Sequence, residues 1–194
     1  MFKGIVLGII LGFVLMFLGT YFYFSSGRVP VATNAPEMPF ERKFAGMALH
    51  AYMEKAPHAN SPVAADEPNL LEGAKLYKAN CSVCHGLPGE PHNAIANGMF
   101  PKPPLLFRGM GVTDDEVWET FTVISGGIRM SGMPGFHDSL SDTQMWQVAQ
   151  LVKNADKLPA SAKAELAAVA GAAALPPAPA PAGKGEEHEH EHIH

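Results

Sequence analysis

Cysteine is nearly absent from this 194-residue sequence, which contains only Cys81 and Cys84, three positions apart. One such pair cannot form a framework of disulfide bonds, so the two residues have to be interpreted as a single local unit. The sequence also lacks a cluster of lysine and arginine, and its formal net charge is -5. Because nucleic-acid binding requires concentrated positive charge to displace counterions from phosphates, we predict no nucleic-acid partner.

A convincing alternation of apolar and polar residues, the pattern of a half-buried strand, is also missing. Between residues 66 and 159, apolar residues recur instead at helical spacing, and proline marks both edges of this stretch. A first helix is predicted around Leu70, Ala74 and Tyr77, where Gly73 permits another element to approach closely. The sequence therefore predicts an all-α domain over residues 66–159.

Two further helices of this domain are predicted from their capping residues. Thr113 and Glu116 have the spacing of a capping box, in which each side chain bonds a free backbone N–H near the helix start. That helix is expected to end at the glycine pair 126–127. Ser141 and Gln144 have the same spacing ahead of the last helix of the domain.

Residues 4–24 contain no charged side chain, and at about 1.5 Å per residue a helix of this length crosses the hydrocarbon of a bilayer. The run ends in aromatic residues, which prefer the headgroup boundary. A cleaved signal peptide is the alternative, but its apolar region is usually about 7 to 15 residues long. We therefore predict a retained transmembrane anchor over residues 1–27, with Lys3 on the cytoplasmic side.

Residues 28–65 are predicted to form an extended linker, because prolines occur near both of its ends. Within it, apolar residues at helical spacing predict a short amphipathic helix; its apolar face contains Phe40, Phe44, Met47, Ala51 and Tyr52. This face either covers part of the domain's own surface or docks on a partner subunit. We favour the first interpretation.

Residues 160–194 differ in composition from the rest of the chain. Alanine and proline dominate first, and histidine then alternates with glutamate up to His194. The alanine-rich residues 161–174 are compatible with a helix, but alanine alone buries too little surface to dock strongly. The prolines that follow predict an extended spacer in this Ala/Pro-rich linker, and a disordered His-rich tail comes after it. Alternating histidine and glutamate can also chelate divalent metal ions, and this alternative stays open.

The segment Cys81-Ser-Val-Cys84-His85 is the five-residue pattern of covalent haem attachment. Two thiols three positions apart on a helical turn lie on one side of the backbone, so both can bond the vinyl groups along one porphyrin edge. His85 then reaches the iron from that same side. A structural zinc site would need two more ligands, and a thioredoxin-like pair expects strands alternating with helices. We therefore predict one haem c, bound through Cys81 and Cys84 and ligated by His85.

Two methionines are candidates for the second axial ligand of the iron, Met130 and Met133. Gly132 permits the backbone to approach the porphyrin closely, and Pro134 stiffens the chain on the other side of Met133. Met130 lacks these neighbours, so Met133 is the predicted ligand. Ordinary core filling is the alternative role for either methionine.

Over residues 70–158 the sequence resembles the class I c-type cytochromes. The features that carry the resemblance are Gly73, Tyr77, the attachment motif, the segment Gly132-Met133-Pro134 and Trp146. The resemblance implies a cytochrome c fold, in which the first and last helices cross beside the haem and Gly73 meets the last helix near Trp146.

The resemblance also implies two further cofactor-binding residues. In this family a proline carbonyl usually accepts the N–H of the proximal imidazole, and the matching residue here is Pro104. Arg129 is a candidate to pair with a haem propionate, although a solvated surface arginine is an equally good interpretation.

These features together predict an electron carrier rather than an enzyme, because an iron with both axial positions filled by His85 and Met133 changes oxidation state without exchanging ligands. Haem attachment of this kind occurs outside the cytoplasm, so the anchor is expected to be a single pass through the inner (cytoplasmic) membrane with the haem domain in the periplasm. The predicted partners are redox proteins of a respiratory or photosynthetic membrane complex. A haem enzyme with an open iron position and a structural or assembly subunit are the alternatives.

Overall fold

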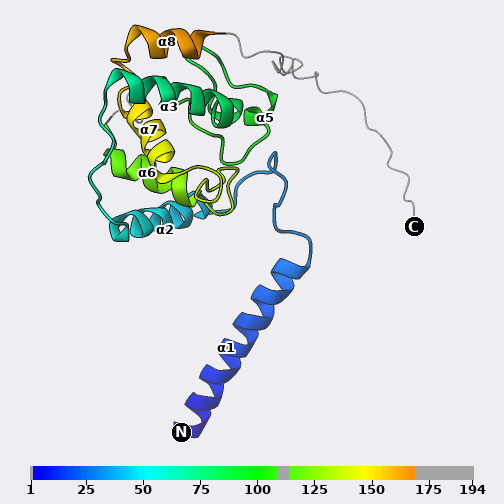
Figure 1. Ribbon diagram of the computed structural model, residues 1–194. Helices are drawn as coiled ribbons and strands as arrows, with labels where there is room; N and C mark the ends of the chain where they lie inside the picture. Colours follow the sequence, from blue (N-terminus) through cyan, green and yellow to red (C-terminus); the bar gives the residue numbers. More distant parts are fainter. Residues whose placement is uncertain (1, 109–113, 169–194) are drawn as a thin grey trace, which may run out of the picture.

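The computed structural model describes residues 2–108 and 114–168, and within these ranges every regular element is a helix (Figure 1). The helices are α1 (Phe2–Ser25), α2 (Glu41–Lys55), α3 (Glu67–Asn80), α4 (Ser82–His85), α5 (Ala94–Asn97), α6 (Val117–Gly126), α7 (Asp142–Lys153) and α8 (Ala160–Ala167). The predicted all-α fold class is thereby confirmed. Most of the predicted tail, from residue 169 onward, lies outside the described residues.

The core of the domain lies where α3 and α6 pack against α7. Tyr77 from α3 and Leu151 from α7 are both fully buried there. A Cβ atom added at Gly73 would lie 2.4 Å from the carbonyl oxygen of Gln147, so glycine is what allows α3 and α7 to approach so closely. Gln147 adjoins Trp146, and the helix crossing is therefore where the resemblance placed it.

Helix α6 begins later than the sequence predicted. The expected start at Thr113 is wrong: α6 begins at Val117, and its N-cap is Glu116, whose backbone is extended. The carboxylate of Glu119 accepts a hydrogen bond from the backbone N–H of Glu116 at 2.8 Å, so the reciprocal cap forms three residues further along the chain. Thr113 itself lies outside the described residues. The predicted end is confirmed, because Gly127 caps the helix with a φ of 65°.

Helix α7 begins as predicted, at the capping box of Ser141 and Gln144. The Gln144 side chain accepts from the Ser141 backbone N–H at 2.9 Å, and the Gln144 N–H donates to the Ser141 hydroxyl at 3.3 Å. Trp146 on this helix stacks on Phe121 of α6, with ring centroids 4.0 Å apart and ring planes 9° from parallel. The stacked pair therefore joins α6 to α7.

Helix α8 occupies the alanine-rich part of the predicted linker, where the composition was compatible with a helix. It packs against α3, and its Ala162 and Leu166 are buried. Lys78 of α3 forms an ion pair with Glu165 of α8. Two buried residues four positions apart thus give α8 an apolar side that packs on α3.

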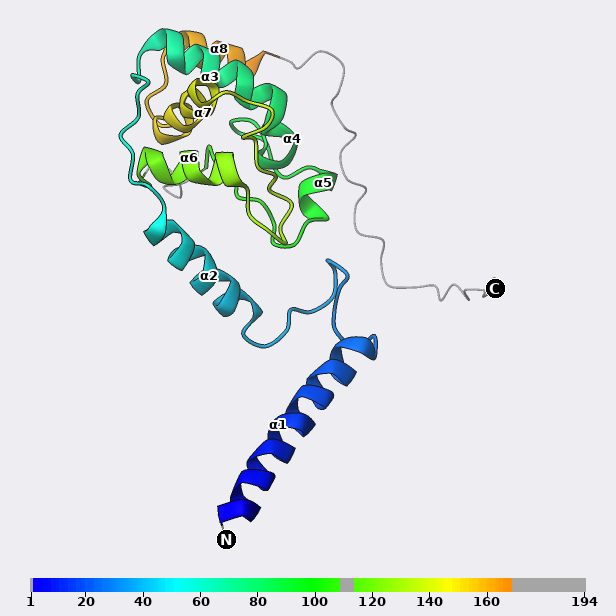
Figure 2. The same ribbon diagram turned by 60° about the horizontal axis from the view of Figure 1, so that its bottom comes forward.

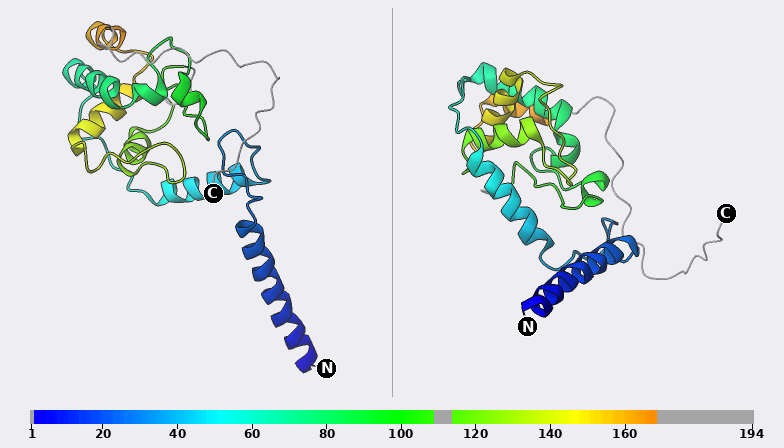
Figure 3. Two further views of the ribbon diagram at one scale, coloured as in Figure 1. Left: turned by 90° about the vertical axis from the view of Figure 1, so that its right-hand side faces the viewer. Right: turned by 90° about the horizontal axis from the view of Figure 1, so that it is seen from below.

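Helix α2 forms where the amphipathic pattern predicted a helix, but its apolar face does not cover the domain. Phe44 and Met47 are 65% and 58% exposed. The half-buried residues are instead on the opposite side of the helix, among them Leu49 and Met53. The favoured interpretation of this face is therefore wrong. Figures 2 and 3 show α2 at the side of the domain nearest the C-terminal end of α1.

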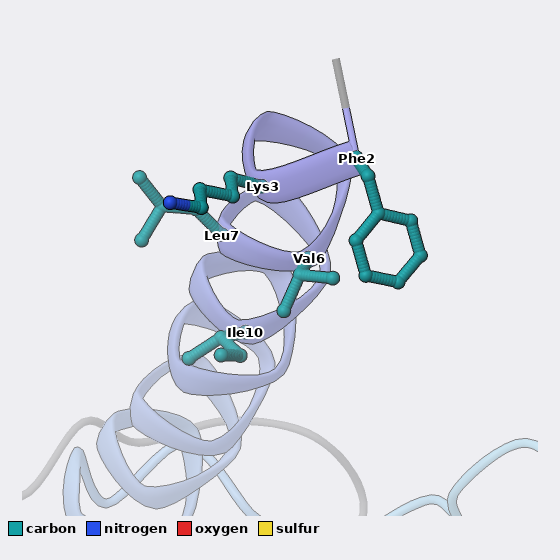
Figure 4. Close-up of a pocket in the computed structure, with 5 residues that line it drawn as sticks. All are labelled: Phe2, Lys3, Val6, Leu7 and Ile10. Atoms are coloured by element: carbon teal, nitrogen blue, oxygen red, sulfur yellow. The ribbon is translucent and has the colours of Figure 1, made fainter.

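Helix α1 projects away from the domain, and none of its described residues is buried. With 24 residues and an apolar composition, α1 is long and apolar enough to cross a membrane, although a signal sequence has the same properties. Figure 4 shows Phe2, Lys3, Val6, Leu7 and Ile10 around a shallow hollow on its first turns. Because all five belong to one helix, this hollow is helix surface rather than an enclosed binding site.

Candidate functional site

The cysteine motif occupies the junction of α3 and α4. Cys81 ends α3, donating its N–H to the Tyr77 carbonyl at 2.8 Å, and its own carbonyl accepts the N–H of His85 at 2.9 Å. Cys84 and His85 therefore lie on the single turn of α4 that begins at Cys81. This local geometry is the helical turn that the spacing of the motif requires, and it places Cys84 and His85 within one turn of Cys81.

His85 is oriented by a residue far from it in the chain. Its Nδ1–H donates to the carbonyl oxygen of Pro104 at 2.8 Å. Burial lowers the pKa of His85 below its usual value, and the hydrogen bond to Pro104 opposes this only in part, so the imidazole is neutral near pH 7. Within the described residues its Nε2 makes no hydrogen bond. A neutral imidazole with one nitrogen fixed by a carbonyl has its other nitrogen ready to bind a metal ion.

A second histidine repeats this arrangement, and the sequence analysis did not single it out. His92 Nε2 donates to the carbonyl oxygen of Pro103 at 2.8 Å, so successive proline carbonyls each accept an imidazole N–H. The only sequence signal is a histidine close to the motif and a pair of prolines downstream. No local spacing rule joins them, because the contact depends on how the chain returns past α4.

The two cysteines are free thiols, and neither forms a disulfide bond. Burial raises the pKa of Cys81 to about 12, with the neighbouring Cys84 contributing. Redox cysteine pairs work through a thiolate of lowered pKa, so Cys81 is unsuited to that role. Free thiols beside an oriented neutral imidazole are the donor set that covalent attachment and ligation of haem require.

Met133 lies in a compact loop between α6 and α7. The N–H of Ile128 donates to the carbonyl of Met133 at 3.1 Å, and the N–H of Met133 donates to the Ser131 hydroxyl at 3.2 Å. At the base of the loop, a Cβ atom added at Gly127 would lie 2.5 Å from the backbone nitrogen of Gly135. The loop is therefore closed by backbone contacts that hold Met133 in one position.

The three methionines near this loop differ in exposure. Met130 is 94% exposed and adopts a left-handed φ of 60°, whereas Met133 is half-buried. Met99, which the sequence analysis did not consider, is also half-buried, and its terminal methyl group lies against Gly132. The contact between Met99 and Gly132 is made possible by the missing side chain of the glycine, since a Cβ atom there would lie 1.7 Å from that methyl carbon.

A chain of contacts connects the cysteine motif to the methionine loop. Asn93 caps α5 and donates through its side-chain amide to the carbonyl of Val83 in α4. Met99 follows α5 directly, donating its N–H to the Ala96 carbonyl, and reaches Gly132. The loop that contains Met133 is therefore connected to the α4 turn through α5 and Met99.

Arg129 lies in the same loop but is exposed, and no hydrogen bond or ion pair joins its side chain to another described residue. The structure thus brings together the cysteines, His85 and Pro104, connects the loop of Met133 to them through α5, and leaves Arg129 in solvent.

Across residues 2–108 and 114–168, no group of three or more His, Cys, Asp or Glu side chains is arranged to hold a metal ion. A conventional zinc site is therefore not formed by the described part of the chain.

The family model described as "Cytochrome C oxidase, cbb3-type, subunit III" matches residues 68–152, the stretch that contains α3 to α7 and the cysteine motif. Residues 68–152 therefore form a c-type cytochrome domain. A cytochrome c domain implies haem c as cofactor and electron transfer as its chemistry.

Curated relatives of this cytochrome are redox proteins. It is 31% identical over 110 residues to "Quinohemoprotein alcohol dehydrogenase ADH-IIG" of Pseudomonas putida, an alignment that covers 54% of the chain and 14% of the relative. It is 34% identical over 89 residues to "Alcohol dehydrogenase (quinone), cytochrome c subunit" of Gluconobacter oxydans, covering 42% and 17%. Identity to "Thiosulfate dehydrogenase" of Allochromatium vinosum is 33% over 91 residues, covering 44% and 31%.

All of these relatives are much longer than the aligned part, so the similarity concerns the cytochrome domain and not the whole of any relative. No solved structure matches the chain.

Proposed function

We propose that this cytochrome is a membrane-tethered electron carrier with a single haem c, attached through Cys81 and Cys84 and ligated by His85 and Met133. The observation that carries the proposal is the orientation of His85. Its Nδ1–H is fixed by the Pro104 carbonyl next to two free thiols, which leaves Nε2 for iron.

The bound haem would supply the ferric–ferrous couple, and the residues of this chain set its surroundings. The Pro104 carbonyl polarises the His85 imidazole and makes it a stronger donor, which favours the ferric state. The thioether of Met133, as a second ligand, would favour the ferrous state and raise the reduction potential. Because the loop of Met133 is closed by its own hydrogen bonds, it would hold this thioether in place in both oxidation states, so that little reorganisation would accompany electron transfer.

The partners in this proposal are membrane redox proteins in contact with the periplasm. Two observations support it: α1 is long and apolar enough to cross a bilayer, and the relatives include a cytochrome c subunit of a dehydrogenase. A tether keeps the carrier at the membrane surface, where its effective concentration for such partners is high. The anchor would be a single pass through the inner membrane, with the domain held outside the cytoplasm.

The methionine ligand is tested by the ferric absorption spectrum of the purified holoprotein. Methionine sulfur on ferric haem gives a weak band near the red end, and we expect Met133→Ala to lose it. Met130→Ala and Met99→Ala are the matched controls and should keep it, since each also removes one thioether near the loop. Survival of the band in Met133→Ala together with its loss in either control would assign the ligand differently.

Covalent attachment is tested by extraction with acidified acetone, which removes haem that is held only by ligation. We expect the pigment to remain with the protein in one equivalent per chain, and Cys81→Ala to lower that retention. Extraction of the pigment from the wild type would refute attachment through the cysteines. Rapid binding of carbon monoxide by the ferrous wild type would instead indicate an open iron position and favour a haem enzyme.

A further inference from the structure

Helix α2 has two apolar sides, and only one of them faces the domain. Leu49 and Met53 are half-buried on the domain side. The other side is a stripe that comprises Phe40, just before the helix, and Phe44, Met47 and Ala51 within it; we call these four residues the α2 stripe. At 100° per residue its members fall on one side, opposite Leu49 and Met53. All four are exposed.

The α2 stripe is held in its outward position by contacts at both ends of the helix. Near the start, the Arg42 guanidinium lies over the Phe100 ring, 5.5 Å from its centroid. Just after the end, His58 stacks on Trp118 of α6, with centroids 4.1 Å apart. Rotation of α2 to bury the stripe against the domain would break both contacts. The stripe is therefore a fixed surface rather than a loosely placed helix side.

The polar residues of α2 lie along the edges of the stripe. Lys43, His50 and Glu54 follow one edge, and Lys55 lies near the other at the C-terminal end. The helix carries three basic and two acidic residues, although the whole chain has a net charge of -5. Aromatic and methionine side chains flanked by lysine are typical of helices that lie in the boundary of a bilayer.

The position of α2 relative to α1 determines which surface can cover the stripe. In the views of Figures 1 to 3, α2 is at the side of the domain nearest the C-terminal end of α1. Residues 26–40 join the two helices, a length that reaches at most about 50 Å when fully extended. A turn shortens this reach, because the N–H of Ala35 bonds back to the Ala32 carbonyl. A bilayer that holds α1 is thus the surface next to α2.

We propose that α2 lies in the headgroup region of the bilayer that holds α1, with the α2 stripe inserted toward the acyl chains. The inference rests on the proposed function in one respect, since it requires α1 to be a retained anchor. Insertion removes the phenylalanine and methionine side chains from water while Lys43 and Lys55 stay among the phosphates. With two attachments, the chain holds the cytochrome domain at a fixed height and orientation above the membrane instead of on a free tether.

Lipid contact is tested with the full-length holoprotein, one copy per nanodisc, in phosphatidylethanolamine and phosphatidylglycerol. A lipid-soluble diazirine is photoactivated in the discs, and the labelled peptides are quantified by mass spectrometry. We expect label in α1 and in the α2 stripe. Phe44→Glu should reduce the label in α2 several-fold without changing that in α1. His50→Glu introduces the same group on the same helix at the polar edge and should change neither.

The outcomes separate this inference from the anchor on which it rests. Label in α1 but not in α2 would overturn the lipid contact and leave the anchor intact, as expected if a second copy or a partner subunit covers the stripe. Equal label of α2 in the wild type and in Phe44→Glu would also overturn it, because the stripe would not be the site of contact. Absence of label from both helices would refute the anchor and the inference together. An unchanged ferric spectrum in both variants shows that each remains folded.

Discussion

His92 and His85 each donate an imidazole N–H to one of two successive proline carbonyls. The Pro103 carbonyl is thereby fixed, and the peptide that joins it to Pro104 is fixed with it. The Pro104 carbonyl orients the imidazole of His85. His92 therefore influences the proposed iron site indirectly, through the peptide that joins Pro103 to Pro104. His92 is therefore a positioning residue that would tune the potential without touching the haem.

Replacing His92 with phenylalanine is expected to raise the reduction potential. The freed proline carbonyls bond His85 less firmly, the imidazole becomes a weaker donor, and the ferric state loses stabilisation. One hydrogen bond is worth about 0.5 to 1.5 kcal/mol, which sets an upper range of roughly 20 to 60 mV for a one-electron couple. Redox titration measures the shift. His50→Phe, on the exposed helix α2, is the control, and an equal shift in both variants would contradict the role of His92.

We predict that the protein loses stability at alkaline pH because of the buried hydroxyl of Tyr77. Its hydroxyl is fully buried and donates to the Gly86 carbonyl at 2.8 Å, and burial is the main reason that its pKa lies above the usual 10. Above about pH 10 the unfolded chain releases this proton while the folded chain keeps it, so the free energy of unfolding falls as the pH rises. The contribution of Tyr77 is fully present below pH 10.

Removal of this hydroxyl isolates its contribution. Tyr77→Phe should be less stable than the wild type at pH 7 by about 1 to 3 kcal/mol, because the Gly86 carbonyl loses its partner. It should also lose less stability between pH 10 and pH 11 than the wild type does. Guanidinium unfolding of the holoprotein at each pH gives both quantities, with Tyr52→Phe on α2 as control. An alkaline slope identical to that of the wild type would exclude Tyr77 as its source.

At the scale of the elements, the crossing of α3 and α7 is the contact least able to accept an added atom. A Cβ atom at Gly73 would meet the backbone carbonyl of Gln147, which cannot rotate away, and the Cβ of Leu151 at 3.2 Å. Gly73→Ala should therefore destabilise the protein by about 1 to 3 kcal/mol, despite the better helix propensity of alanine. Chemical unfolding measures the change.

Gly46 of α2 is the matched control for this substitution. It also lies within a helix, but an added Cβ atom would have no neighbour within 4 Å. Gly46→Ala should therefore gain about 1 kcal/mol from helix propensity alone, so the two variants should change stability in opposite directions. Destabilisation of similar size in both would mean that the α3–α7 contact is not the cause.

Local patterns predicted the elements whose signals lie within a few residues of one another. The Ser141–Gln144 cap and the turn from Cys81 to His85 are of this kind. The start of α6 was not predictable in this way, because Thr113-x-x-Glu116 fits the capping-box pattern, whereas the second box, which forms from Glu116 and Glu119, begins with a residue that is not a usual N-cap. A long-range contact, from Lys153 of α7 to the Asp115 carbonyl at 2.7 Å, holds the chain extended before the second box, and no local pattern contains it.

The same division applies to the candidate site. The spacing of the motif was sufficient for the thiols and His85, whereas Pro104 required a family resemblance, since nothing local connects residues 19 positions apart. His92 and Met99 were missed altogether, because their roles depend on the return of the chain past α4 and on the missing side chain of Gly132. Residues placed by non-local packing carry no periodic signal in the sequence.

At the scale of the whole molecule, apolar surface is unevenly distributed. The domain buries its apolar residues between α3, α6, α7 and α8, whereas α1 and the α2 stripe expose theirs. An apolar helix with no buried residue is not stable in water on its own, so its surroundings have to supply the burial. A bilayer would supply it along the whole length of α1, as the proposed anchor requires.

Retention of α1 is decided by the mature N-terminus. If α1 is an anchor, the holoprotein should stay in the membrane fraction through an alkaline carbonate wash, and its intact mass should include residues 1–27. If α1 is a cleaved signal sequence, the haem protein should be soluble and begin near Arg28. Arginine at both Ile10 and Phe13 costs about 2.5 to 3.5 kcal/mol each at the centre of a membrane helix, so the double variant should leave the membrane fraction. As a control, two arginines are placed instead at the exposed residues Lys43 and Lys75, which leaves α1 intact and should not change fractionation. An effect of the α1 variant alone would show that burial of α1 in lipid holds the protein in the membrane.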